Sequence, residues 1–152
     1  MSQLDLNVDV LQRDVNCRLC KLGATVDRAC LLGSPIRKRK IMVVLEAPTE
    51  LEQKRGEVDP PELIVKMLED VGIDTSKVFF CYSVSCATEK PTKAQIKACR
   101  KWLDAQIEAV EPKFVLVVGS TSLLAVMNKT GIKNHRGRPV EVTVGDRSMV
   151  FF

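Results

Sequence analysis

Short continuous apolar runs recur along the chain and are separated by polar segments. Such runs are typical of strands that are buried on both faces, as in a parallel sheet. Turn-forming residues bound them, for example Ala47-Pro48 after the first run. Three strands are predicted on this basis, at 41–45, 78–84 and 114–118. Two further short strands are predicted at 140–144 and 148–152, with a turn at Gly145-Asp146 between them.

Apolar residues in two other segments have helical spacing. Over Leu4–Val15 they recur every three or four positions, which predicts an amphipathic helix that ends at Cys17. A second helix is predicted over 62–71, because Pro60-Pro61 precede it and Gly72 follows it. These helices lie before the first and second predicted strands.

The clearest helical signal follows the second strand. Thr92 and Gln95 fit a capping box, and the apolar face that follows includes Cys99. Cys99 is therefore expected to point inward, near the end of the strand that carries Cys86. A shorter helix is predicted over 123–127, after a turn at Gly119-Ser120.

Strands that alternate with helices favour an α/β fold, a three-layer α/β/α sandwich with a mainly parallel central sheet. The 152 residues, with 45% hydrophobic content, suit one domain over residues 1–152. The last run ends the chain inside a strand that no helix covers. We therefore expect a domain that lacks its C-terminal segment, with a closing edge strand as the alternative.

No apolar run is long enough to cross a bilayer, and the N-terminal segment does not have the pattern of a signal peptide. These features predict a soluble protein of the cytoplasm. The formal net charge of +4 is compatible with a polyanionic partner without requiring one. Basic residues gather at 37–40 and again at Lys129, Lys133, Arg136 and Arg138, although such blocks are usually solvated loops.

Six cysteines in a chain without a secretory signal favour metal or redox chemistry over structural disulfides. Cys81 lies in an apolar run, and both it and Cys30 fit the alternative of small buried hydrophobic residues. Cys17 and Cys20 do not fit that alternative, because they lie in a polar stretch.

Cys17, Cys20, Cys86 and Cys99 form one close pair and one wide pair, and four thiolates bind either tetrahedral zinc or an iron-sulfur cluster. The wide second pair favours a 4Fe-4S cluster over zinc, and both over disulfides. Such a cage would close a loop of about eighty residues between Cys17 and Cys99 and so stabilise the fold.

Two motifs carry a resemblance to a known family. The first is Cys17-Arg18-Leu19-Cys20-Lys21-Leu22, and the second is Leu45-Glu46-Ala47-Pro48-Thr49 with Glu52-Gln53 and Gly56 behind it. The chain resembles the iron-sulfur uracil-DNA glycosylases of family 4 and the related domain of some phage DNA polymerases. Pro91, Gln95, Cys99 and Gly119-Ser120 match residues of the family in the same order, which extends this similarity over nearly the whole chain.

The resemblance implies a 4Fe-4S cluster, DNA as the partner, and hydrolysis of the N-glycosidic bond of uracil in DNA, as in base excision repair. It implies these site residues: Glu46 as the catalytic acid; Ser120, Arg136 and Arg138 on DNA; Ala47 and Tyr82 at the base pocket; Cys17, Cys20, Cys86 and Cys99 on the cluster.

Three of the family's features are absent from this sequence. No Phe follows Gly56 to stack on the base, Tyr82 stands where the family has a base-reading Asn, and the one histidine, His135, is not in the family's His-Pro-x-Ala motif. A half-buried strand residue is the other interpretation of Tyr82. These departures keep two alternatives open. One is a DNA-binding module without base excision, such as a phage, polymerase-associated domain, and the other is a zinc protein with a structural role.

Overall fold

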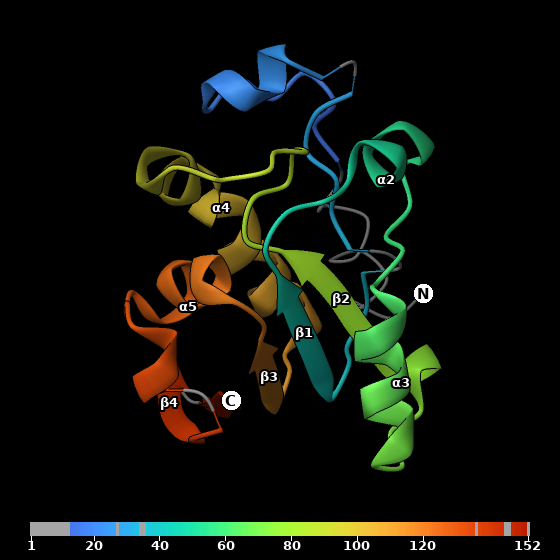
Figure 1. The fold of residues 1–152 in the computed structure, drawn as a ribbon, viewed down its shortest axis with the longest axis vertical. Helices are drawn as coiled ribbons and strands as arrows, with labels where there is room; N and C mark the ends of the chain where they lie inside the picture. Colours follow the sequence, from blue (N-terminus) through green and yellow to red (C-terminus); the bar gives the residue numbers. More distant parts are fainter. Residues whose placement is uncertain (1–12, 27, 34–35, 136, 145–146, 152) are drawn as a thin grey trace, which may run out of the picture.

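The computed structural model describes residues 13–26, 28–33, 36–135, 137–144 and 147–151, which form an α/β fold around one sheet (Figure 1). The strands are β1 (Ile41–Leu45), β2 (Val78–Tyr82), β3 (Phe114–Val117), β4 (Val140–Val144) and β5 (Arg147–Phe151). The helices are α2 (Glu50–Arg55), α3 (Glu62–Asp70), α4 (Lys93–Val110) and α5 (Ser120–Met127), with short 3-10 helices η1 (Lys21–Ala24), η2 (Thr75–Lys77) and η3 (Ile132–Asn134).

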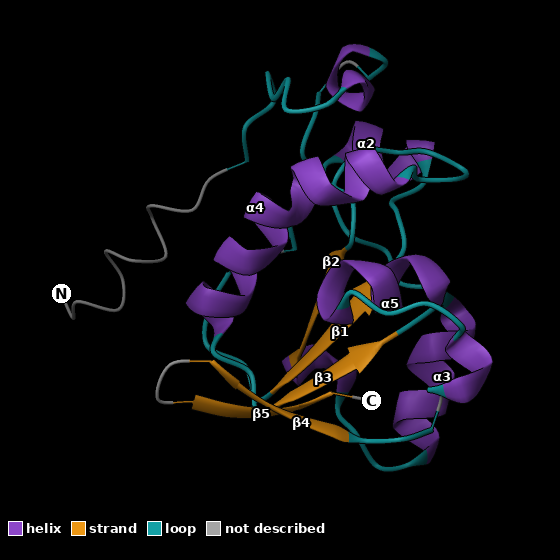
Figure 2. Cartoon of the chain, turned by 90° about the vertical axis from the view of Figure 1, so that its left-hand side faces the viewer, coloured by secondary structure: helices purple, strands orange, loops and turns teal. Residues whose placement is uncertain are grey.

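The sheet has the strand order β2-β1-β3-β5-β4. Strand β1 pairs in parallel with β2 and β3, β3 pairs in parallel with β5, and β4 is antiparallel to β5. The arrowheads of β1, β2 and β3 accordingly point to the same end of the sheet, beyond which α2 lies (Figure 2). This topology confirms the predicted mainly parallel sheet.

Side chains of β1 alternate between two apolar clusters, one on each face of the sheet. Met42 and Val44 pack in the cluster that includes residues of α4 and α5. Val43 and Leu45 pack in the cluster that includes Leu68 of α3. Because both faces of β1 are covered, its sequence is continuously apolar instead of alternating. The sheet is therefore the middle layer that the sequence predicted.

The capping box predicted at the start of α4 is present. The Thr92 side chain accepts a hydrogen bond from the Gln95 backbone, and the Gln95 side chain accepts one from the Thr92 backbone. The helix ends at Val110, and Glu111 takes a left-handed conformation just before Pro112. A second capping box, between Thr49 and Glu52, begins α2, a helix that the apolar pattern did not predict because it has one turn and little apolar surface.

The helix predicted up to Cys17 is wrong in the part that the structure describes. Residues 13–20 form turns and bends, while residues 1–12 lie outside the described residues. The Asp14 side chain accepts a hydrogen bond from the Asn16 backbone, and Cys17 N–H donates to the Asp14 carbonyl at 3.1 Å. Such local side-chain bonds compete with helix formation. The first cysteine pair is thus held by turns and by η1, which begins directly after Cys20.

Three strand predictions need adjustment. Strand β2 ends at Tyr82 instead of Val84, β3 ends at Val117 instead of Val118, and β5 begins at Arg147 instead of Ser148. The turn predicted at Gly145-Asp146 lies outside the described residues. In the described part of the chain, no helix is both long and apolar enough to cross a membrane.

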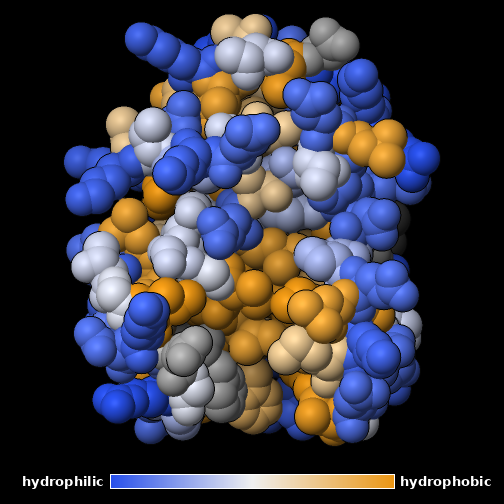
Figure 3. Space-filling view, in the orientation of Figure 1, coloured by the Kyte–Doolittle hydropathy of each residue, from blue (hydrophilic) through white to orange (hydrophobic). Residues whose placement is uncertain are grey.

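Apolar side chains also reach the surface on one side of the molecule. In the view of Figure 3 they gather in the middle of the face, between α5 and α3 of Figure 1. Leu63 and Met67 of α3 are among the exposed large apolar residues, as are Val71 and Phe114. Among the described residues, the face of the sheet on the α3 side is therefore covered less completely than the face beneath α4 and α5.

Candidate functional site

The carboxyl ends of β1, β2 and β3 form one hydrogen-bonded edge. Ser83 N–H donates to the Leu45 carbonyl at 2.8 Å, and Val118 N–H donates to the Val44 carbonyl at 3.0 Å. Because β2 and β3 lie on opposite sides of β1, the chain reverses its direction of winding here. Open α/β sheets bind ligands at this kind of switch point. The loops after these strands are therefore the first place to look for a site.

Glu46 occupies this edge as the residue directly after β1. Its side chain is exposed and lies over Gly119, so closely that a Cβ on Gly119 would stand 2.0 Å from Glu46 Oε1. Gly119 has φ 92° and ψ 166°, a conformation that is essentially confined to glycine. The loop after β3 thereby leaves the space in which the Glu46 carboxylate lies.

Serine hydroxyls link the same loops below the surface. Ser83 Oγ donates to the Leu45 carbonyl at 3.0 Å and lies 3.0 Å from Ser122 Oγ, and both serines are buried. Ser120, the first residue of α5, is exposed next to Gly119. The structure therefore brings Glu46 and Ser120 together, on loops that the buried serines connect.

Ala47 and Tyr82, the two predicted base-pocket residues, serve the packing of this region. Ala47 is partly buried against the cluster beneath α4 and α5. Tyr82 is only 2% exposed, and its hydroxyl donates to Glu52 Oε2. The ring lies among apolar side chains of the α3 side, so the interpretation of Tyr82 as a strand residue of the core describes it better than a surface for stacking.

Glu52 forms hydrogen bonds to the segments that precede and follow α2. Its Oε1 accepts hydrogen bonds from the Thr49 backbone at 3.0 Å and from the Thr49 hydroxyl at 3.1 Å. Its Oε2 accepts from the Asp59 backbone at 2.8 Å and from Tyr82. A buried carboxylate is tolerated when its acceptors are occupied in this way. Glu52 thus joins β2 to the segment that follows Glu46.

Of the two predicted DNA-contacting arginines, Arg136 lies outside the described residues. Arg138 is exposed and precedes β4, and both β3 and β5 lie between β4 and β1, the strand that Glu46 follows. Their role on DNA stays a prediction from the sequence.

The four predicted metal-ligating cysteines do converge. Cys17 and Cys86 share an apolar cluster against which Cys20 packs. Cys99 on α4 accepts a hydrogen bond from the Ser85 backbone at 3.3 Å, directly beside Cys86. None of the chain's six cysteines forms a disulfide. The fold therefore brings together thiols that are about eighty residues apart in sequence. They lie in the N-terminal turns, in the segment after β2 and on α4.

Burial favours the protonated thiol at two of these cysteines, Cys86 and Cys99. It raises the pKa of Cys99 to about 11, although the Ser85 N–H lowers it, and Cys86, Cys20 and Cys17 raise it by their charges. Burial likewise raises the pKa of Cys86. A metal would have to displace these protons, since only thiolates are strong ligands.

Cys30 is a fifth thiol beside the four, and spacing gave no sign of it. Its backbone N–H donates to Cys86 Sγ at 3.3 Å, and its thiol is 1% exposed. Burial raises the pKa of Cys30 to about 12, with further contributions from Cys17, Cys99 and Cys86. By contrast, Cys81 is enclosed in the sheet core, in the cluster that packs beneath α4 and α5, as predicted for a small buried hydrophobic residue.

Close backbone packing shapes the loop around the first cysteine pair. A Cβ on Gly23 would lie 1.9 Å from the Cys17 carbonyl oxygen, so the turn of η1 requires glycine. The Arg18 guanidinium donates to the carbonyls of Cys17 at 2.9 Å and Gly23 at 3.0 Å. The loop that holds Cys17 and Cys20 is thus tied together locally.

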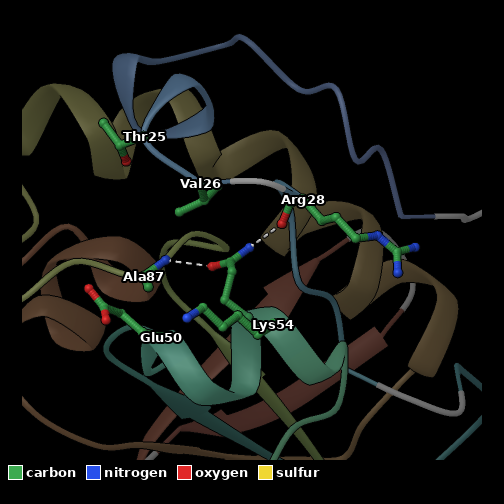
Figure 4. A pocket seen from close by; sticks show the side chains of 7 residues that line it. Thr25, Val26, Arg28, Glu50, Lys54 and Ala87 are labelled. Carbon is green, nitrogen blue, oxygen red and sulfur yellow. Dashed lines mark hydrogen bonds between the residues drawn. The ribbon is translucent and has the colours of Figure 1, made fainter.

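Gln53 of α2 connects this cysteine region to the loop that carries Glu46. Its Nε2 donates to the Arg28 carbonyl at 2.7 Å, and its Oε1 accepts from Ala87 N–H at 2.6 Å (Figure 4). The side chain is 3% exposed. It forms one wall of a pocket of about 300 Å³ lined by Thr25, Val26, Arg28, Glu50, Gln53, Lys54 and Ala87.

Sequence spacing did not reveal Gln53 and Cys30 because their contacts join distant segments. The Gln53 side chain bonds to backbone groups of Arg28 and Ala87, and the Cys30 backbone N–H bonds to the Cys86 sulfur. The only sequence signal for Gln53 was its place in the Glu52-Gln53 pair. Among the described residues, no group of three or more His, Cys, Asp or Glu side chains is arranged to hold a single metal ion.

Comparison with known proteins identifies the family of the chain. A family model described as the uracil DNA glycosylase superfamily matches residues 33–150, which include all of β1 to β4 and both Glu46 and Gly119. The chain belongs to this superfamily.

Several superfamily relatives have names that are more specific. A type-4 uracil-DNA glycosylase of Sulfurisphaera tokodaii is 31% identical over 124 residues, 77% of this chain and 56% of that protein. One of Thermotoga maritima is 28% identical over 151 residues, 94% of this chain and 78% of that protein. The DNA polymerase of Bacillus phage SP01 is 27% identical over 117 residues, 72% of this chain but 13% of the polymerase. The chain thus spans little more than half the length of the first of these relatives.

Proposed function

We propose that this chain hydrolyses the N-glycosidic bond of uracil in DNA, at the carboxyl edge formed by β1 and β3. The main support is the placement of Glu46, an exposed carboxylate held over Gly119 beside the start of α5. The names of the type-4 relatives supply the substrate class. A DNA substrate and six free cysteines together favour the cytoplasm of a bacterial or phage-infected cell as the site of action.

In the proposed reaction, the uracil nucleotide leaves the base stack and reaches the edge of the sheet. Glu46 orients a water molecule and accepts its proton as the water oxygen bonds to the sugar C1′. The bond between C1′ and the base nitrogen breaks, and the base departs with the electron pair. The Glu46 carboxylate also stabilises the positive charge that develops on the sugar.

The start of α5 is suited to the phosphate next to this nucleotide. Backbone N–H groups at a helix N-terminus favour anions, and Ser120 adds an exposed hydroxyl there. Because Gly119 separates Ser120 from the strand and lies against Glu46, the phosphate and the scissile bond would be held by one loop.

Replacing Gly119 tests whether this loop positions Glu46. In Gly119→Ala, the new methyl group would displace the carboxylate, and the backbone would cost about 1–3 kcal/mol of stability. We expect the rate of uracil excision to fall by more than the loss of stability, measured by the melting temperature, can explain. The control is Gly72→Ala, since Gly72 also has positive φ but no atom within 4 Å of an added Cβ. Equal effects of both variants on excision would contradict a positioning role.

We also propose that Cys17, Cys20, Cys86 and Cys99 hold a 4Fe-4S cluster. The donor set is four soft thiol ligands, three of them buried. Two backbone N–H groups, of Cys30 and Ser85, already point to the sulfurs. Trp102 packs against the same apolar cluster, and its buried Nε1 has no acceptor within the described structure. The sulfur atoms of a cluster could accept a hydrogen bond from this indole N–H.

Zinc fits this group less well than a cluster. Ligands of structural zinc sites usually come as two close couples, whereas here Cys17 and Cys20 are close and Cys86 and Cys99 are twelve residues apart. Four thiolates are also the ligand set of a 4Fe-4S cluster. When bound, a 4Fe-4S cluster would act as a cross-link between the N-terminal turns, the segment after β2 and α4. It has no step in the proposed hydrolysis.

Gln53 is expected to stabilise the segments that carry the cysteines. Gln53→Glu keeps the acceptor for Ala87 but places an oxygen against the Arg28 carbonyl, which should cost about 1–3 kcal/mol. We expect a lower melting temperature and faster release of iron from the purified protein. Gln95→Glu is the matched control, because a glutamate also completes a capping box. Equal iron release from both variants would contradict this role.

One observation favours a second candidate function, a DNA-binding module without excision. Tyr82 stands where the resembled family has its base-reading Asn, and it has no side-chain amide; its hydroxyl is buried and already bonded to Glu52. Incubating the purified protein with a duplex that contains one uracil, and with a thymine duplex, decides between the two. Abasic sites only in the uracil duplex support the glycosylase. Salt-dependent binding without abasic sites supports the module.

A further inference from the structure

Three lysines stand side by side at the amino edge of the sheet. Lys40, Lys77 and Lys113 each come directly before the first residue of β1, β2 and β3. The register pairs Ile41 with both Val78 and Phe114, so the lysines neighbour one another in the order Lys77, Lys40, Lys113. Lys113 N–H donates to the Lys40 carbonyl at 2.9 Å. With strands about 4.8 Å apart, this lysine row is about 10 Å long.

The surroundings of the lysine row are mostly basic. All three lysines are exposed, and the basic segment 37–40 leads into the row. Lys38 forms an ion pair of 2.9 Å with Glu111. Asp74 is near the other end: hydrogen bonds from Ser76 lower its pKa, and the charge of Lys77 lowers it slightly more. Cations therefore outnumber the carboxylates that face them.

Adjacent like charges on neighbouring strands are destabilising, because they repel at short range. A row of three lysines at the same level of three strands therefore costs stability that a mixed pattern would not. A polyanion bound along the row would relieve this repulsion and release counterions. The basic segment 37–40, which the proposed active site does not use, lies at the same edge.

The lysine row is also far from Glu46. It precedes β1 and Glu46 follows it, and five residues of parallel strand rise about 16 Å. A nucleic acid segment that lies along the carboxyl edge would therefore not lie along the row at the same time without bending around the molecule.

We propose that the lysine row binds the phosphodiester backbone of a nucleic acid, as a second contact separate from the Glu46 edge. A line of exposed ammonium groups suits contacts to phosphates, which position a nucleic acid without reading its sequence. The row would hold a second segment of DNA, or a distant part of the same molecule, while the other edge is occupied. This binding does not depend on base excision at Glu46.

The test compares two triple variants with the same change in charge. Lys40→Gln, Lys77→Gln and Lys113→Gln together remove the row, whereas Lys66→Gln, Lys97→Gln and Lys101→Gln remove three exposed lysines from α3 and α4. Fluorescence anisotropy with a labelled duplex without uracil gives the affinity at several salt concentrations. We expect the row variant to bind roughly tenfold more weakly, with the slope of log K against log salt reduced by about 2 to 3. The control should change the slope by less than 1.

A footprint gives an independent readout on the unmodified protein. Lysine acetylation followed by mass spectrometry should show Lys40, Lys77 and Lys113 protected by the duplex, and Lys66, Lys97 and Lys101 unprotected. Equal slopes for the two triple variants, or no protection of the row, would overturn the proposal. So would a row variant that binds the duplex normally but loses binding to a poly-glutamate peptide, because that result assigns the row to an acidic protein. Excision of uracil from a short oligonucleotide is measured separately, so failure of one proposal does not hide the other.

Discussion

Glu46→Gln is expected to lower the rate of uracil excision by about 10²- to 10⁴-fold, the usual contribution of a general base. The amide keeps the size of the side chain over Gly119 but cannot accept a proton from water or stabilise positive charge on the sugar. Because Glu46 is exposed, stability should change by less than about 0.5 kcal/mol. The measurement is single-turnover cleavage of a uracil duplex at abasic sites, alongside thermal unfolding.

The matched control is Glu62→Gln, which also neutralises an exposed carboxylate near the start of an element, on α3. It should excise uracil at the rate of the unmodified chain. Affinity for a duplex should be similar in both variants, since the change at Glu46 acts on the chemical step. If Glu46→Gln excises uracil as fast as the control, Glu46 is not the general base and the proposed site is wrong.

Cys86→Ala is expected to abolish cluster binding and to cost the largest share of stability of any single change. The cross-link between Cys17 and Cys99 closes a loop of about eighty residues, which corresponds to about 4–5 kcal/mol in a chain-entropy estimate. For a protein of this size, that loss lowers the melting temperature by about 10–20 °C. Iron content and absorbance at about 400 nm should fall together with it.

Cys81→Ala is the control, because Cys81 is equally buried but lies in the sheet core. It should keep iron and colour and lose only the stability of a small cavity. Oxidative removal of the cluster from the unmodified protein gives a second measurement that needs no variant. A colourless protein that contains zinc, or iron retained in Cys86→Ala, would contradict the cluster assignment.

Excision and cluster loss are expected to be linked through packing. Gln53 bonds to the segments around Arg28 and Ala87, and its helix begins a few residues after Glu46. Residues that hold the cysteines together therefore also hold the loop of the proposed active site. The link is structural, so no redox change of the cluster is required for the hydrolysis.

Local patterns were sufficient for most of the fold. The apolar runs at β1, β2 and β3 are continuous because both faces of the sheet are covered, and this feature is visible in the sequence. The capping box at Thr92 is a contact within four residues, so it too could be predicted correctly. The helix expected before Cys17 was not confirmed in the described part, because a side-chain bond of Asp14 and contacts to residues 28–29 outweigh the apolar spacing.

The sequence by itself determined the α/β class, the order of the strands along the chain and the four cysteines as candidate ligands, since these depend on residue type and spacing. Glu46 became a candidate through the resemblance to a known family. Only the tertiary structure decided that Gly119 makes room for Glu46, that Gln53 joins the cysteine segments to α2, and that Lys40, Lys77 and Lys113 are neighbours. The reason is physical: these contacts join segments far apart in the chain, and strand order and register, which no local pattern encodes, set which residues meet.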